Sequence, residues 1–370
     1  MLGARRRAAR LLANLTSLIV LAGCSSVPIE SQTIRSPSPG DCGLEETTSG
    51  TSLSDVTVLA GAGPNTEPYL LWGIEKGCFQ HFGLKITSGA VANQSERIAA
   101  LNGGSADIVM ALNTTLVQVY SNSGQALQVV APIYWYSDSE LQAARAATSF
   151  EGRLLSTTVL VTQPTNNIDS LEDLQGQSIG TISGAGAVTY GLFNALGRVN
   201  LGKEDVELVI LSADLLVQAF ERGELDAVMV GGAYAAKLIN GGGKPLLYPA
   251  VFFYEPGPAT MWVTSEEKLA ENPELYKKFS NAVAATTELL SLPENRKDFE
   301  DFLKREYDLS QADIDFAPIQ TLSNQPIDEA DLSYVVPALK AHGVIETDVP
   351  VGRFLEMWDA DSPMTDHDLR

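Results

Sequence analysis

The chain has 370 residues, 45% of them hydrophobic, and carries 25 basic against 46 acidic residues, a formal net charge of −21. This length accommodates two domains with complete cores. So acidic a surface argues against partners such as nucleic acid or anionic lipid, because both require positive charge. The overall charge says nothing about a binding site, which can differ from the rest of the surface.

The chain begins with the pattern of a cleaved signal peptide, residues 1–23. Four arginines lie within residues 5–10, and an interrupted apolar run follows at residues 11–21. This run is too short for a membrane-spanning helix, which needs roughly 20 apolar residues. Cleavage would remove four of the 25 basic residues and no acidic one, leaving 21 against 46 and a net charge of −25.

Residues 21–24, Leu-Ala-Gly-Cys, resemble the lipobox of bacterial lipoproteins. In that family the signal is cut before the cysteine, here Cys24, which then carries acyl chains. The resemblance implies an extracytoplasmic protein anchored to the bacterial cell membrane; the alternative is a simple secretory signal with an incidental cysteine. Residues 24–54 are rich in Ser, Thr, Pro and Gly and predict a flexible tether.

Two further cysteines, Cys42 and Cys78, allow two interpretations. Outside the cytosol they can form a disulfide, which would pin the tether to the first helix. Alternatively Cys78, between Gly77 and Phe79, is a small buried apolar residue. The sequence leaves both open.

Strands and helices alternate along the first part of the chain. Apolar runs bounded by turn residues predict strands, and apolar residues with a period of 3.6 predict helices. The expected strands are residues 56–60, 85–87, 107–111 and 126–133, and the expected helices are residues 67–76, 94–102 and 114–121. This order predicts a parallel sheet with right-handed crossovers.

A second alternating series follows residues 134–155, which we expect to contain the first crossing between two lobes. The expected strands are residues 156–162, 177–182, 206–211 and 227–231, and the expected helices are residues 185–197, 215–222 and 233–239. The chain then returns through residues 245–258 to a strand at 259–264. Long helices are expected at 273–292, 295–307 and 334–342, before an acidic tail at 359–370.

One motif occurs in both series. Residues 100–110 read ALNGGSADIVM and residues 219–229 read AFERGELDAVM, so that Asp107 falls on Asp226. Each copy predicts a helix end, a glycine stop and an apolar strand that begins with an aspartate. Two copies indicate two α/β lobes, each with a sheet edge at which ligands commonly bind.

Four stretches carry a family resemblance. Residues 68–86 and 96–111 are similar to the first lobe of periplasmic solute-binding proteins for nitrate, aliphatic sulfonates, taurine and the pyrimidine precursor of thiamine. Residues 170–180, SLEDLQGQSIG, resemble that family's Ser-Leu-x-Asp-Leu-Lys-Gly-Lys-x-Val/Ile-Gly, and residues 223–227 resemble its Gly-x-Val/Leu-Asp-Ala. The likeness covers about residues 54–295, and the order and spacing of the motifs make it specific.

The resemblance implies a two-lobed α/β fold, the type II periplasmic-binding-protein fold, with two parallel-sheet lobes joined by two crossing segments. Lobe 1 is expected at residues 55–133 and 258–358, and lobe 2 at 134–257, with crossings near 131–157 and 245–259. Ligand would lie between the lobes, held by loops that follow the strands.

The candidate ligand-binding residues lie on those loops and on two aromatic segments. Each has a plainer alternative: a tight turn for the glycine-rich loop, an N-cap for the Asn-Thr-Thr run, and interface packing for the aromatic rings. The family often has Asp/Glu-Pro-Tyr at residues 232–234, of which only the tyrosine remains. The candidates are Pro64, Asn65, Glu67, Asn113, Thr114, Thr115, Tyr134, Trp135, Ser183, Gly184, Ala185, Gly186 and Tyr234.

Other chemistries lack support. The run from Gly184 to Thr189 suggests a dinucleotide fingerprint, but Thr189 stands where the third Gly or Ala should be. His81, His342 and His367 have no metal-binding or catalytic motif around them, so we expect no cofactor, no metal and no enzyme. Arg97 and Arg222 fall on helices and not on the loops, which favours an organic solute over an inorganic anion.

The sequence therefore predicts a monomeric solute-binding lipoprotein of an ABC importer. Its partners would be a small organic solute of the sulfonate or taurine type or of the pyrimidine or vitamin type, the permease and ATPase subunits, and the membrane through its anchor. Nucleic acid is not expected as a partner. An exported enzyme on the same fold and a ligand-sensing lipoprotein are the alternatives.

Overall fold

The first lobe is built on a five-stranded sheet, in the order β2-β1-β3-β10-β4. Its strands are β1 (Ser54–Ala60), β2 (Leu84–Ala90), β3 (Ile108–Leu112), β4 (Leu127–Tyr136) and β10 (Gly257–Ser265). Strands β1, β2 and β3 run parallel, and β10 lies antiparallel between β3 and β4. Strand β10 belongs to the segment that returns from the second lobe.

The second lobe has a sheet of the same design, in the order β7-β6-β8-β5-β9. Its strands are β5 (Thr158–Thr162), β6 (Ser178–Thr181), β7 (Glu207–Ile210), β8 (Ala227–Gly231) and β9 (Lys244–Leu247). Here β6, β7 and β8 are parallel, and β5, the first strand after the crossing, lies antiparallel between β8 and β9.

The expected two-lobed α/β fold is confirmed, but the expectation that both sheets are parallel is wrong. Each lobe takes its one antiparallel strand from a crossing segment. The chain in order shows only alternating strands and helices, which favours parallel pairing. The strand that the other lobe delivers does not follow a helix crossover from a neighbouring strand of the same sheet, so it can enter in the opposite direction.

The structure is a computed structural model that describes Cys42 and residues 53–62, 66–91, 93–146, 158–315 and 322–358, all within the unit Ser31–Arg370. The signal peptide with Cys24, most of the tether, Pro64, Asn65, residues 147–157 of the first crossing and the tail 359–370 lie outside them. No helix in the described ranges is long and apolar enough to span a membrane.

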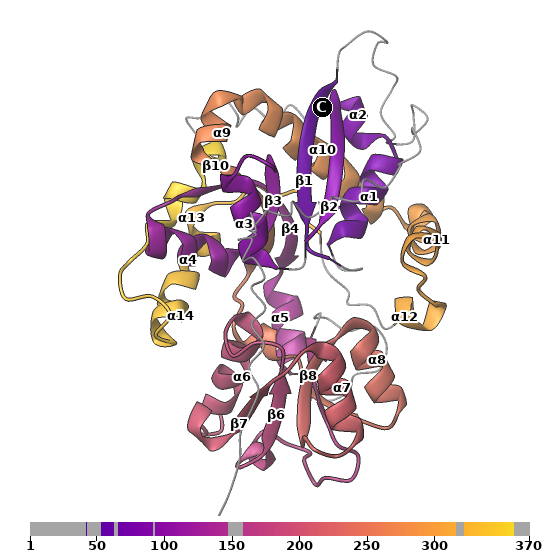
Figure 1. Ribbon diagram of the computed structural model, residues 1–370, viewed down its shortest axis with the longest axis vertical. Helices are drawn as coiled ribbons and strands as arrows, with labels where there is room; N and C mark the ends of the chain where they lie inside the picture. Colours follow the sequence, from indigo (N-terminus) through magenta and orange to yellow (C-terminus); the bar gives the residue numbers. More distant parts are fainter. Residues whose placement is uncertain are drawn as a thin grey trace, which may run out of the picture. The chain divides into compact units, whose positions relative to one another are not determined.

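Helices surround both sheets (Figure 1). In lobe 1 they are α1 (Glu67–Glu75), α2 (Cys78–His81), α3 (Gln94–Asn102), α4 (Asn113–Ser123), α9 (Glu266–Glu271), α10 (Pro273–Ser291), α11 (Arg296–Tyr307), α12 (Gln311–Asp315), α13 (Glu329–Ser333) and α14 (Val335–Ala341). In the crossing and lobe 2 they are α5 (Asp138–Arg145), α6 (Ala187–Gly197), α7 (Ala213–Glu221) and α8 (Gly232–Asn240).

Short 3-10 helices complete the chain. They are η1 (Glu172–Leu174), η2 (Lys203–Asp205), η3 (Pro249–Phe252), η4 (Pro293–Asn295), η5 (Val351–Phe354) and η6 (Glu356–Trp358). Apart from these, six elements were not expected from sequence: α5 after β4, the strand β9, and the short helices α2, α9, α12 and α13. Helix α5 begins with a capping box between Ser137 and Glu140, a local signal that the sequence does contain.

Strand β3 shows why the sheet of lobe 1 is covered on both faces. Its alternate residues Ile108 and Met110 belong to one apolar cluster, and Val109 and Ala111 belong to another. All four are less than 9% exposed. A strand with two buried faces reads as a continuous apolar run, as this one does. Helix α10 covers one face, with Tyr276, Phe279 and Val283 buried at helical spacing.

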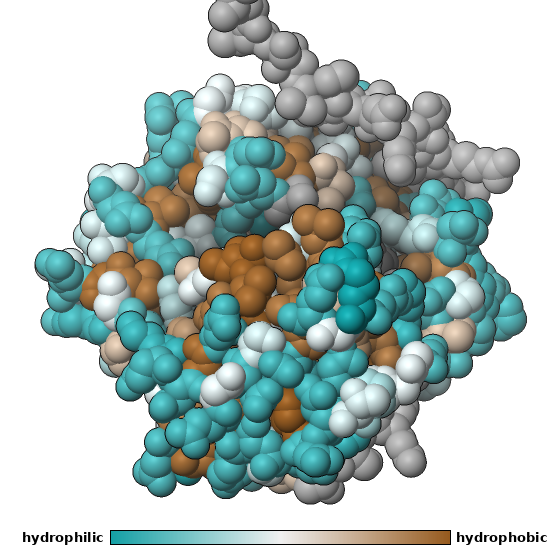
Figure 2. Space-filling view, turned by 60° about the horizontal axis from the view of Figure 1, so that its bottom comes forward, coloured by the Kyte–Doolittle hydropathy of each residue, from teal (hydrophilic) through white to brown (hydrophobic). Residues whose placement is uncertain are grey.

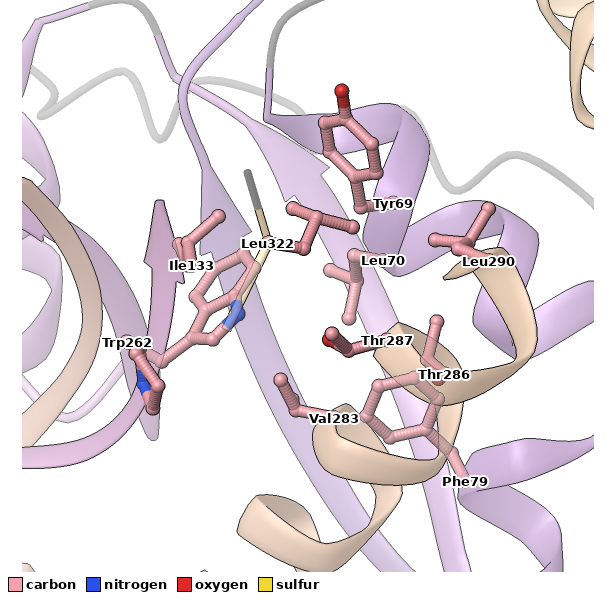
Figure 3. Close-up of a pocket in the computed structure, with 11 residues that line it drawn as sticks. Tyr69, Leu70, Phe79, Ile133, Trp262, Val283, Thr286, Thr287, Leu290 and Leu322 are labelled. Carbon is pink, nitrogen blue, oxygen red and sulfur yellow. The ribbon is translucent and has the colours of Figure 1, made fainter. Parts of the chain in front are cut away.

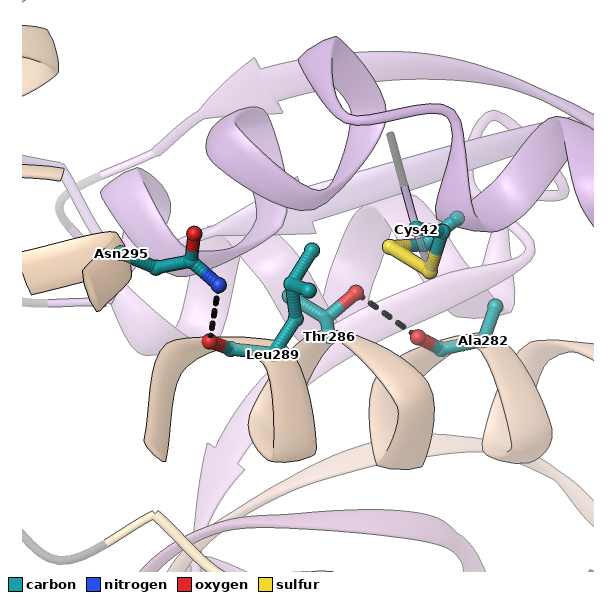
Figure 4. The surroundings of a disulfide bond; sticks show 6 residues. Cys42, Ala282, Thr286, Leu289 and Asn295 are labelled. Carbon is teal, nitrogen blue, oxygen red and sulfur yellow. Dashed lines mark hydrogen bonds between the residues drawn. A yellow bond between two sulfur atoms is a disulfide. The ribbon is translucent and has the colours of Figure 1, made fainter. Parts of the chain in front are cut away.

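A disulfide joins Cys42 to Cys78, the first residue of α2. Cys42 is 9% exposed and Cys78 is 0% exposed. The bond lies beside α10, where Thr286 donates a hydrogen bond to the carbonyl of Ala282 at 2.7 Å (Figure 4). Of the two interpretations of these cysteines, the structure supports the disulfide. It ties a residue of the tether to the core of lobe 1.

The surface is mostly hydrophilic. On the face shown in Figure 2 most residues are hydrophilic, and apolar residues gather near its middle. Among the described residues only six large hydrophobic side chains count as exposed. Their positions matter for the site.

Candidate functional site

The candidate site lies at the carboxyl ends of the strands in both sheets. Both crossings reach the sheets at the carboxyl edges: Gly257, where β10 begins, pairs with Tyr136 at the end of β4, and Thr158, where β5 begins, pairs with Gly231 at the end of β8. The loops after β1, β3, β6, β7 and β8 therefore lie on the edges from which the lobes are connected. This is the edge at which open α/β sheets bind ligands.

Five helices start at these edges without a side-chain cap. They are α1, α4, α6, α7 and α8, preceded by Thr66, Leu112, Gly186, Ser212 and Gly231. By contrast α3 and α5 are capped by Asn93 and Ser137. An uncapped start leaves backbone N–H groups without a side-chain acceptor and concentrates positive potential there. Such helix starts can donate hydrogen bonds to a ligand.

In lobe 2, the predicted loop is exposed from Ser183 to Ala185, half-buried at Gly186, and leads into α6. Two side-chain hydrogen bonds hold the shape of this loop, because Thr181 and Thr189 both donate to the carbonyl of Ser183, at 3.0 and 2.7 Å. Gly186 has a φ of 103°, which favours glycine. Thr189, the residue that breaks the dinucleotide pattern, thus serves to hold this loop.

In lobe 1, Asn113, Thr114 and Thr115 are the first three residues of α4 and are 1%, 3% and 8% exposed. The expectation that they cap the helix is wrong, since the N-cap is Leu112. Asn113 instead donates hydrogen bonds to the carbonyl of Pro258 at 3.0 Å and to Tyr334 Oη at 2.7 Å. Its Oδ1 is buried and accepts no hydrogen bond among the described residues.

Glu67 is the first residue of α1 and is half-buried. Tyr307, at the end of α11, donates a hydrogen bond to Glu67 Oε2 at 2.9 Å. Burial raises the pKa of Glu67 above its ordinary value, and the hydrogen bond from Tyr307 opposes this only in part. Burial and the nearby Glu67 carboxylate also raise the pKa of Tyr307. Glu67 is therefore a half-buried carboxyl group at this edge, and no basic side chain pairs with it among the described residues.

The aromatic run Tyr134, Trp135 and Tyr136 forms the end of β4, which extends three residues beyond the expected strand. Tyr134 is buried, and its ring meets that of Tyr69 edge to face with centroids 5.8 Å apart. Burial raises the pKa of Tyr134 well above its ordinary value. Tyr136 packs on Tyr254 at 5.1 Å. Trp135 is half-buried and packs against the apolar cluster that contains Tyr254.

Tyr234, in the first turn of α8, is 36% exposed and donates a hydrogen bond to Asp214 Oδ1 at 2.7 Å. Three exposed apolar residues that sequence reasoning missed share its edge of lobe 2. Ile182 follows β6, Ile210 ends β7 and Leu215 lies in the first turn of α7. Their apolar nature gave no signal, because the sequence alone assigns such residues to the core.

Two pockets lie on the α10 side of the lobe 1 sheet. One is lined by Tyr69, Leu70, Phe79, Pro132, Ile133, Trp262, Val283, Thr286, Thr287, Leu290 and Leu322. Figure 3 shows that the hydroxyl of Tyr69 points away from the other side chains. The second pocket shares Pro132 and Val283 with the first. Neither contains a predicted site residue.

Arg97 lies in α3, as expected, and is 2% exposed. Its guanidinium donates hydrogen bonds to the carbonyls of Met110, at 3.0 Å, and Val91. Burial lowers the pKa of Arg97 to about 10. Arg222 forms a salt bridge with the neighbouring Glu224. The described residues contain no cluster of His, Cys, Asp and Glu that could hold a metal ion.

Comparison with known proteins agrees with this architecture. The model of the NMT1/THI5 like family matches residues 152–295. The family resemblance read from the sequence is thus confirmed over lobe 2 and the start of the returning segment. The search of curated proteins found no match.

Solved structures extend the likeness to most of the chain. The periplasmic aliphatic sulphonate binding protein SsuA of Escherichia coli matches at a TM-score of 0.64 with 15% identity, covering 83% of this chain and 98% of that one. A Candida albicans gene product, described as showing the generic periplasmic binding protein fold, matches at 0.60 with 16% identity, covering 82% and 96%. The desulfurization enzyme DSZB matches at 0.58 with 15% identity, covering 81% and 96%.

The protein therefore has the periplasmic-binding-protein fold. At these identities the structures show the fold alone, and the fold is shared by binding proteins and by at least one enzyme. The site itself must carry any statement about function.

Proposed function

We propose that this protein is an extracytoplasmic solute-binding protein that captures a small organic molecule and delivers it to an ABC importer. One observation carries the proposal: both sheets present uncapped helix starts at the carboxyl edges where the crossings enter. Two donor-rich edges joined by two crossings suit a molecule that is gripped from both sides. The similarity to SsuA, a protein named for sulphonate binding, supports this role.

Binding would proceed by closure of the lobes about residues 131–157 and 245–259. Helix starts α4, α6 and α8 would donate hydrogen bonds to acceptor atoms of the solute. The candidate residues Tyr134, Trp135 and Tyr234 would pack on its body, and Pro64, Asn65 and Glu67 would complete the wall in lobe 1. The closed form would then be the one that the permease recognises.

Anchoring through Cys24 belongs to the same proposal. The lipobox-like residues 21–24 and the tether support it. A Cys24→Ser variant should lose the incorporation of labelled palmitate and appear in the soluble fraction. Unchanged labelling and membrane attachment of this variant would rule the anchor out.

The processed protein should respond to its solute in two ways. Thermal unfolding should shift upward by several degrees at saturating solute, since ligand binding adds to the stability of the folded state. Small-angle scattering should show a smaller radius of gyration as the lobes close. Isothermal titration would give the stoichiometry, which we expect to be one to one.

An exported enzyme on the same scaffold is the competing function, because DSZB shares the fold. Mass spectrometry of the incubated mixture separates the two. Solute recovered unchanged from a stable complex supports capture, whereas steady conversion to a product contradicts it.

A further inference from the structure

Four exposed apolar side chains gather at the carboxyl edge of lobe 2. We call them the apolar rim: Ile182, Ile210, Leu215 and Tyr234, which are 65%, 59%, 48% and 36% exposed. They make up four of the six large hydrophobic residues that are exposed in the described ranges. Leaving such side chains in water is unfavourable, and their concentration at one edge marks a surface that is covered during function.

The rim residues lie at the ends of neighbouring elements. Strands β7, β6 and β8 are neighbours in the sheet, so the residues at their ends lie side by side. A Cβ built on Gly184 would lie 3.0 Å from Ile210 Cδ1, which shows that this side chain rests against the predicted ligand loop. The hydrogen bond from Tyr234 to Asp214 joins the first turns of α8 and α7.

The charge at both edges is acidic. The connecting segments and first turns of α1, α4, α6, α7 and α8, as far as they are described, contain two charged residues, Glu67 and Asp214. The arginines of α3 and α5 are already engaged by main-chain carbonyls. Arg97 donates to Met110 and Val91, and Arg145 donates to Val251 and Tyr254.

From these observations we propose that the solute is an organic molecule with an apolar body that is uncharged or carries a single positive charge, and that the apolar rim binds this body. The inference rests on the proposed function and specifies its substrate class. Glu67 and Asp214 would repel a sulfonate or an inorganic anion and would attract an ammonium group. The helix starts can still donate to carbonyl, ring-nitrogen or hydroxyl acceptors of such a molecule.

The position of the apolar rim indicates that it binds the solute. Ile182 immediately precedes loop 183–186, and Ile210 lies against Gly184 of this loop, which leads to the start of α6 and its donors. A surface reserved for the permease would have no need to lie on the ligand loop. Use of the rim by the permease is therefore the alternative that the experiment must separate.

The first experiment varies only the head group of the probe. Titration calorimetry of the processed protein would use hexylamine, hexanol and hexanesulfonate, the corresponding three phenylmethyl compounds, and sodium sulfate and nitrate. We expect the amines and alcohols to bind at least about tenfold more tightly than the matched sulfonates, and the inorganic salts not to bind. Tighter binding of the sulfonates would overturn this inference and leave solute capture intact. Failure of every compound to bind would reject solute capture itself.

The second experiment tests the rim. Ile182→Ser and Leu215→Ser should each weaken binding of the preferred probe by about tenfold, because each removes most of one apolar contact. The matched control is Leu292→Ser, an exposed leucine (41%) beyond the end of α10, which should leave the affinity unchanged. Asp214→Asn should reduce the preference for amine over sulfonate. Rim variants that bind normally but fail in uptake would assign the rim to the permease and reject the inference.

Discussion

Gly191 is the point at which α6 touches the segment that returns to lobe 1. A Cβ at this position would lie 2.0 Å from the carbonyl oxygen of Pro249 and 3.2 Å from Ala250 Cα. Both atoms belong to the main chain of η3, so neither can rotate away as a side chain would. The helix can approach η3 this closely only because residue 191 has no side chain.

Gly191→Ala should therefore lower the free energy of unfolding by about 2–4 kcal/mol, the cost of forcing extra volume into a packed contact. Gly197→Ala, in the same helix, is the matched control, because its Cβ would meet nothing within 4 Å. That variant should be neutral or more stable by up to about 1 kcal/mol, since alanine favours a helix over glycine. Urea unfolding of both variants measures the difference, and equal stabilities would refute the contact.

The repeated motif forms the same element in both lobes. Gly104 and Gly223 have φ values of 73° and 72°. The aspartate after each plays one role: Thr57 N–H donates to Asp107 Oδ2, and Ser178 N–H donates to Asp226 Oδ2, both at 2.9 Å. Each carboxylate thus ties the start of its strand to the neighbouring parallel strand. This is the end of the sheet opposite the candidate site, so the motif that first suggested two lobes is structural.

Asp226→Asn should destabilise the protein by about 2 kcal/mol at neutral pH, because the bonds from Ser178 and Asn166 are to a charged acceptor. Burial alone would raise the pKa of Asp226, but these bonds bring it below the ordinary value of 3.8. A lowered pKa stabilises the folded state at every pH above the ordinary pKa. This stabilisation is lost as the pH falls through the lower pKa of the folded state. The gap between wild type and variant in the free energy of unfolding should therefore narrow below pH 3.8.

Urea unfolding at pH 7 and in the acid range measures this gap. Glu346→Gln, at an exposed position outside the helices where the described residues give it no hydrogen bond or ion pair, is the control and should match wild type at every pH. A gap between wild type and Asp226→Asn that stays constant as the pH falls would contradict the assigned role of the carboxylate.

Across the whole molecule, the C-terminal helices contact both lobes. Helix α14 lies against α4 of lobe 1. At its end, the ring of His342 stacks on Tyr190 of lobe 2, with centroids 4.5 Å apart, and its Nε2 lies 3.1 Å from Asn194 Oδ1. The sequence predicted that these helices cover the first lobe, and it gave no sign of the contact with α6.

The contact between His342 and Tyr190 predicts that the stability of the fold depends on pH. Burial, and then the charge of Lys203, lower the pKa of His342 below its ordinary value of 6.5. As the pH falls through 6.5 the unfolded chain takes up the proton first, so the folded state loses stability between 6.5 and the lower folded value. His342→Phe keeps an aromatic ring on Tyr190 but cannot titrate.

Urea unfolding at pH 7.5 and at pH 5.5 compares the two proteins. The variant should lose less stability than wild type over this interval. Equal losses would show that His342 does not titrate against the packing of α6.

The sequence by itself determined the two α/β lobes, the family resemblance and most of the element boundaries. Apolar periodicity and glycine stops are local signals, and the structure confirms them in the repeated motif. The sequence also identified the loops after the strands, because the carboxyl edge follows from strand direction alone. Contact of Tyr234 and Ser183 with a solute stays a prediction.

Only the tertiary structure decided which strands pair and which side chains face water. The antiparallel strands β5 and β10 and the disulfide between Cys42 and Cys78 depend on contacts between segments far apart in the chain. Asn113 became a buried donor to Pro258 and not a helix cap for the same reason. The exposure of Ile182, Ile210 and Leu215 at one edge is likewise a property of packing, since a local sequence pattern cannot show which apolar residues the fold leaves uncovered.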